Sequence, residues 1–154
     1  MELRILGIAG SVALLAALSG SDAAAQQSLK YAAQMNGTTE TPPNTEKATG
    51  TATMTLANNQ LRYTITVKSL SGPATSAHIH VGKVGASGPP VYTFTINSTS
   101  SGTLAVGSVD LTKDVSKGVS GDSLRVLLNT GNAYVNVHTS AHAAGEIRGQ
   151  LKKP

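Results

Sequence analysis

All four histidines lie in two short segments in which polar and apolar residues alternate. His78 and His80 are two residues apart within residues 77–82, and His138 lies in residues 134–151. Imidazole nitrogens bind first-row transition metals, and side chains at positions i and i+2 of a strand are about 6.5–7 Å apart along the backbone. Both rings of such a pair can reach one ion with bonds of about 2 Å. The pattern therefore predicts a metal site at His78, His80 and His138.

The available donors limit the choice of metal. The chain has no cysteine, which excludes disulfides, thiolate metal sites and a cysteine nucleophile. Imidazole ligation without thiolate suits copper(II) or zinc. His142 falls in the loop 140–145, where ordering a side chain costs conformational entropy, so we expect it to be an optional or second-site ligand. In the alternative interpretation the histidines are structural and hydrogen-bond to carbonyls and carboxylates beneath a loop.

The histidine segments are predicted to be strands with one buried face. Successive side chains of a strand point to opposite faces, so Tyr134, Asn136 and His138 share a polar face while Val135 and Val137 share the core face. The two histidines of the first segment also share one face. Pairing of the two strands, or folding of the loops, is expected to bring the three rings together.

A third polar pattern follows at the end of the chain. Glu146, Arg148 and Gln150 are predicted to lie opposite Ile147 and Leu151. Glu146 and Arg148 are two residues apart, which favours an ion pair. No second carboxylate is near in sequence, so a structural role is favoured over acid–base catalysis.

The rest of the chain has the composition of an antiparallel all-β domain. Short β-branched runs separated by turn formers predict about eight strands, and Asn58-Asn59 predicts a hairpin turn. This favours a β-sandwich or Greek-key barrel with one or two short helices. The predicted strands before the histidine segment at 134–151 are residues 29–35, 49–56, 61–70, 75–81, 91–96 and 103–109.

One or two short helices are predicted between the last strands. Residues 110–120 are expected to hold a marginal helical turn. A clearer helix follows, with Asp122 as its N-cap and Gly131 as its terminator. Leu124 and Leu128 form part of its apolar stripe.

The first 25 residues are predicted to be a secretory signal peptide. Arg4 supplies the positive start, residues 5–18 are apolar, and the small residues 23–25 form a cleavage site. The apolar run is shorter than the ~20 residues that span a bilayer, so no membrane span is expected after cleavage. We expect a periplasmic or secreted protein whose residues 26–154 form one domain.

The charge pattern argues against a nucleic-acid partner. The formal net charge is only +4, and the lysines and arginines are scattered, with Lys152 and Lys153 as the single adjacent pair. A nucleic-acid-binding protein would be expected to carry a dense basic patch.

Several motifs resemble those of one family. Residues from about 30 to 151 resemble the CHRD domain, first described in chordin and widespread in bacterial exported proteins, through "ATGTATMTL", "LRYTITVKSLSGPATSAHIHVG", "GPPV" and "YVNVHTSAHAAGEIRGQL". The sequence departs from the family pattern at "TETPP" (39–43), which replaces Asn-Glu-Val-Pro-Pro, and at "HAAG" (142–145), which replaces Asn-Pro-Gly-Gly. The resemblance implies a CHRD-like β-sandwich in an extracytoplasmic setting.

Two enzyme families share short motifs with the chain. The His-x-His strand is similar to the copper strand of copper/zinc superoxide dismutases, but the cysteines of that family are missing and no Asp-rich zinc loop follows His80. Residues 121–124 spell the GDSL block of esterases, yet no aspartate follows Asp122, so a Ser-His-Asp triad cannot be completed in that order. A dismutase-like copper enzyme remains a remote alternative, and no catalytic residue is predicted.

The sequence thus leads to a principal hypothesis and one main alternative. We expect an exported, non-enzymatic binding module that holds copper or zinc through its strand histidines. The alternative is a metal-free domain that contacts an extracytoplasmic protein or a matrix.

Overall fold

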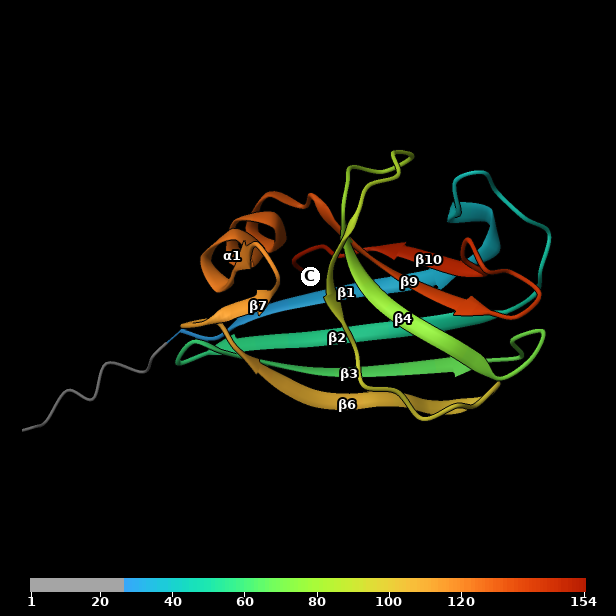
Figure 1. Cartoon of the computed structure of the whole chain (residues 1–154), viewed down its shortest axis with the longest axis horizontal. Coiled ribbons are helices and arrows are strands. Elements are labelled where there is room, and N and C mark those ends of the chain that lie inside the picture. The colour runs from blue at the N-terminus through green and yellow to red at the C-terminus, as the bar shows by residue number, and fades with distance from the viewer. Residues whose placement is uncertain (1–26) are drawn as a thin grey trace, which may run out of the picture.

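The computed structural model describes residues 27–154, so the predicted signal peptide at residues 1–25 lies outside the described residues. Within this range an eight-stranded antiparallel sheet has the strand order β5-β4-β9-β10-β1-β2-β3-β6. It curls into a half-barrel, and β4 crosses in front of the other strands in the view of Figure 1. These strands are β1 (Leu29–Asn36), β2 (Thr49–Ala57), β3 (Gln60–Lys68), β4 (Ala74–Val81), β5 (Pro90–Thr93), β6 (Gly102–Asp110), β9 (Ala133–Thr139) and β10 (Ile147–Gln150).

This architecture confirms the predicted antiparallel all-β fold class. The final strand β10 pairs with the first strand β1, so the two ends of the domain meet inside the sheet. The segment 94–101 connects the two outer parts of the sheet. The Phe94 amide donates to the Ala77 carbonyl of β4 at 3.0 Å, and the Asn97 amide donates to the Leu104 carbonyl of β6 at 2.7 Å.

The β2–β3 hairpin forms as predicted. Asn58 and Asn59 adopt positive φ angles of 50° and 62°, the conformation that a tight hairpin turn requires. Along β3, Leu61 and Ile65 are fully buried, whereas Arg62 and Thr64 are exposed. The period of two seen in the sequence therefore separates the core from the outer face.

The buried apolar face of β4 and β9 anchors the histidine strands. Ile79, Val135 and Val137 are each 0% exposed, and Val135 pairs directly with Ile79. Burying such side chains contributes about 1.5–3 kcal/mol each. Because side chains alternate, this packing holds the intervening histidines on the opposite, outer face.

The prediction of a helical turn within residues 110–120 was wrong. The segment instead forms a small hairpin of β7 (Asp114–Ser116) and β8 (Val119–Ser120). Gly118 provides a positive φ of 79° between them, which a hairpin accommodates and a helix does not. A single-turn 3-10 helix, η1 (Gly37–Thr39), occurs instead after β1.

The helix α1 (Gly121–Thr130) follows β8, but Asp122 is not its N-cap. The cap is Ser120, whose hydroxyl accepts a hydrogen bond from the Ser123 amide at 3.1 Å. Asp122 lies in the first turn and forms an exposed ion pair with Arg125. Gly131 ends the helix in the left-handed conformation, as predicted. Within residues 27–154 no helix is long and apolar enough to cross a membrane.

Candidate functional site

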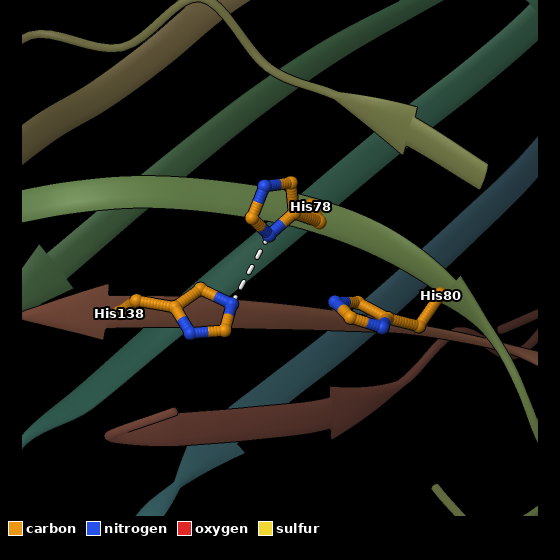
Figure 2. Close-up of side chains that lie close together, drawn as sticks. All are labelled: His78, His80 and His138. Carbon is orange, nitrogen blue, oxygen red and sulfur yellow. Dashed lines mark hydrogen bonds between the residues drawn. The ribbon is translucent and has the colours of Figure 1, made fainter. Parts of the chain in front are cut away.

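Strand pairing brings the three predicted histidines together on the outer face of the sheet. β4 and β9 are antiparallel neighbours, with His78 opposite Asn136 and Ser76 opposite His138. One nitrogen from each of His78, His80 and His138 lies within 4.8 Å of the others. Figure 2 shows the three rings side by side, two from β4 and one from β9. The sequence-predicted cluster is therefore present in the fold.

Backbone carbonyls fix the orientation of two of these rings. His80 Nδ1 lies 2.8 Å from the Gly88 carbonyl oxygen, and His138 Nδ1 lies 3.0 Å from the Ala143 carbonyl oxygen. A carbonyl only accepts hydrogen bonds, so each Nδ1 carries the proton. In the neutral ring Nε2 is then an unprotonated acceptor. Both rings therefore present an Nε2 lone pair.

The two lone pairs have different partners. His138 Nε2 lies 3.1 Å from His78 Nδ1, which donates to it (Figure 2). His80 Nε2 is buried and has no hydrogen-bond partner within the described part of the chain. A buried acceptor without a partner costs about 1–3 kcal/mol. The His80 ring is thus held in an orientation that leaves this acceptor without a partner among residues 27–154.

The environment keeps the cluster uncharged at neutral pH. Burial, followed by the neighbouring His138 and His80, lowers the pKa of His78 to about 4. Burial also lowers the pKa of His80 and of His138, although each donates a hydrogen bond to a carbonyl that opposes the shift. Neutral imidazole is the form that binds metal ions.

The spacing of the nitrogens is compatible with one shared ion. Two nitrogens on a tetrahedral zinc ion with bonds of about 2.0–2.1 Å lie about 3.3 Å apart. The His78–His138 separation of 3.1 Å is close to this value. The remaining separations, up to 4.8 Å, would shorten through small rotations of the rings. The cluster could hold copper or zinc and leave a coordination position free.

A layer of side chains and loops covers the site. Tyr134 stacks on His80 with ring centroids 5.0 Å apart and an interplanar angle of 14°. Arg148 places its guanidinium carbon 3.5 Å from the centroid of the Tyr134 ring. Arg148 and Asn136 are each only 3% exposed, so the polar face of these strands is buried beneath loops.

The predicted Glu146–Arg148 ion pair is not formed. Glu146 precedes β10, so the alternation that places Arg148 on the outer face does not extend to it. Its fully buried carboxylate accepts hydrogen bonds from the Ser71 amide at 2.7 Å, the Ser71 hydroxyl at 2.6 Å and the Thr139 hydroxyl at 2.5 Å. Glu146 and Arg148 therefore both have structural roles, but they bind different loops: Glu146 binds Ser71, and Arg148 binds loop 82–90.

His142 lies apart from the cluster. Its Nε2 is 3.1 Å from the Glu46 carboxylate, and it lines a cavity of about 290 Å³ with Glu40 and residues of its own loop. Burial raises the pKa of Glu40, whose carboxylate accepts a hydrogen bond from the Asn136 side chain. Sequence reasoning missed the contribution of Glu40, because its burial depends on how the loop packs.

The model of the CHRD domain matches residues 31–151, nearly the whole described chain, which confirms the resemblance found in the sequence. No curated protein and no solved structure matches the chain.

Proposed function

The chain belongs to the CHRD domain family, and from that premise we propose that it is an exported binding module that holds one copper or zinc ion through His78, His80 and His138. The observation that carries the proposal is the buried, unpartnered Nε2 of His80 beside the Nε2 of His138. A bound cation would give this acceptor its missing partner.

The three histidines would contribute differently. His80 and His138 are set in the Nδ1–H form by carbonyls, so their Nε2 atoms are ready to coordinate without a change of tautomer. His78 donates from Nδ1 to His138 in the absence of metal, so it must move that proton before Nδ1 can coordinate. We expect His78 to complete coordination after the other two.

Export is part of the proposal. Its support is the signal-peptide pattern of residues 1–25 and the extracytoplasmic setting that the family resemblance implies. Copper and zinc are both compatible with three imidazoles, so a competition between the two ions decides the metal.

The test is a titration of the metal-free protein with Cu(II) and Zn(II), followed by calorimetry and thermal unfolding. One equivalent should bind, and a ligand at a hundredfold excess over Kd should stabilise the folded state by about 2.7 kcal/mol. Alanine at His78, His80 or His138 should each cause a large loss of affinity, and His142→Ala, the matched control, a small one. An unchanged melting midpoint with both ions would contradict the proposal. A large effect at His142 with none at His138 would place the site elsewhere.

The metal-free interaction domain remains a second candidate because of a surface feature beside the site. A groove of about 360 Å³ runs between loop 82–90 and strands β1 and β10, and Val84 at its edge is 73% exposed. Under this alternative, alanine at the three cluster histidines leaves partner binding unchanged, whereas Val84→Ser weakens it.

A further inference from the structure

Arg148 is a buried cation that forms no ion pair within the described chain, and its charge reaches the Glu40 carboxylate only at longer range. Arg148 is 3% exposed. Burying an arginine is costly unless its donors are satisfied. The hydrogen bonds that its guanidinium group donates must therefore offset the cost of its burial.

Those hydrogen bonds hold loop 82–90 against the sheet. Arg148 Nη2 donates to the Lys83 carbonyl at 3.0 Å and to the Ala86 carbonyl at 2.9 Å, while Nη1 donates to the Thr41 hydroxyl at 3.2 Å. One planar guanidinium thus connects β10 to two loops. Lysine has a single ammonium group and cannot reproduce this arrangement.

The same loop provides the carbonyl that orients His80. Gly88 accepts from His80 Nδ1 and also contacts the Tyr134 hydroxyl, whose ring lies between Arg148 and His80. The return of the loop is tight, because a Cβ at Gly88 would lie 1.9 Å from the Val81 carbonyl oxygen. A shift of residues 83–86 would therefore displace the Gly88 carbonyl.

We propose that Arg148 is a positioning residue for His80: it fixes loop 82–90 so that the Gly88 carbonyl keeps the ring in the Nδ1–H form with Nε2 directed into the histidine cluster. The positioning itself holds for the metal-free protein. Its consequence for metal affinity rests on the proposed function.

The first measurement uses the metal-free protein. Nitrogen NMR of the imidazoles should show His80 as a single Nδ1–H tautomer in the wild type and a mixture in Arg148→Lys and Arg148→Gln. Both variants lose the guanidinium fork, but only the glutamine variant loses the charge, so it leaves no stranded buried cation and should fold if the lysine variant does not. Arg62→Lys, at an exposed position of β3, is the matched control and should leave the tautomer unchanged.

The second measurement is a double-mutant cycle on Cu(II) affinity. Loss of the groups that orient a metal-bound histidine costs about 10–100-fold in metal affinity, so we expect that loss in both Arg148 variants. In a His80→Ala background the same substitutions should cause no further loss, because the ring that Arg148 positions is gone. An effect of equal size with and without His80 would overturn the proposal, since Arg148 would then act through the fold in general.

The two measurements separate the hypotheses. If the wild type binds neither Cu(II) nor Zn(II), the proposed function fails, and the tautomer measurement alone decides the role of Arg148. An unchanged single His80 tautomer in both Arg148 variants would overturn the positioning proposal, whatever the copper titration shows.

Discussion

Acidification should destabilise the metal-free protein through His78. The pKa of this residue is about 4 in the folded state, against about 6.5 in an unfolded chain. Between these values the unfolded chain binds a proton that the folded chain does not, so the free energy of unfolding decreases as the pH falls. The full interval would correspond to about 3 kcal/mol. His78 is partly exposed, and solvent screening reduces the expected loss to about 1–2 kcal/mol.

The assay is urea unfolding at pH 7.5 and pH 4.5, in the presence of a chelator, for the wild type and His78→Gln. The wild type should lose about 1–2 kcal/mol more than the variant over this interval. Other groups, such as Glu40 with its raised pKa and Asp110 with its lowered pKa, titrate in both proteins and largely cancel. An equal pH dependence in the two proteins would refute the argument that the cluster resists protonation.

Three further substitutions test the local structure by urea unfolding. Glu146→Gln should lower the free energy of unfolding by about 2–4 kcal/mol. The fully buried carboxylate accepts hydrogen bonds from one amide and two hydroxyls, whereas the glutamine amide has only one acceptor oxygen. A decrease below about 0.5 kcal/mol would contradict this account. Gly88→Ala should destabilise loop 82–90, because the added Cβ would meet the Val81 carbonyl oxygen. Gly72→Ala is the control and should be nearly neutral, because no atom lies within 4 Å of the added Cβ. Equal effects of the two substitutions would argue against close packing of the loop at Gly88. Ser120→Ala should lower the free energy of unfolding by about 1 kcal/mol, because the helix cap is lost. Asp122→Ala should lower it by less. The reverse order would indicate that Asp122 is the cap.

Alternation was enough to predict the face on which the histidines lie. His78, His80 and His138 are separated from buried apolar residues by one position each, and a strand leaves no other arrangement. The pairing of β4 with β9 was expected only as one of several ways to join the segments. It depends on contacts between residues about 60 positions apart, which local patterns do not specify.

The groups that orient the rings could not be predicted in the same way. Gly88 and Ala143 contribute backbone carbonyls, which every residue type carries, so no side-chain signal marks them. Arg148 was correctly placed on a polar face, but its partners are two loop carbonyls and a loop hydroxyl. The competing ion pair with Glu146 looked favourable only because regular alternation was extended one residue beyond the start of β10.

The helix cap shows a similar limit. Both Ser120 and Asp122 are residue types that cap helices, and the apolar stripe is compatible with a start at either position. The small β7–β8 hairpin was not predicted from the sequence. Its strand β8 ends at Ser120, so the helix begins at Gly121 and Ser120 is the cap.

The central claim is that three strand histidines share one ion, and electron paramagnetic resonance of the protein loaded with one equivalent of Cu(II) tests it most directly. The account predicts a single copper species with three imidazole nitrogens, one of which is lost in each of His78→Ala, His80→Ala and His138→Ala and none in His142→Ala. A copper spectrum without imidazole nitrogens, or one that these three substitutions leave unchanged, would contradict it.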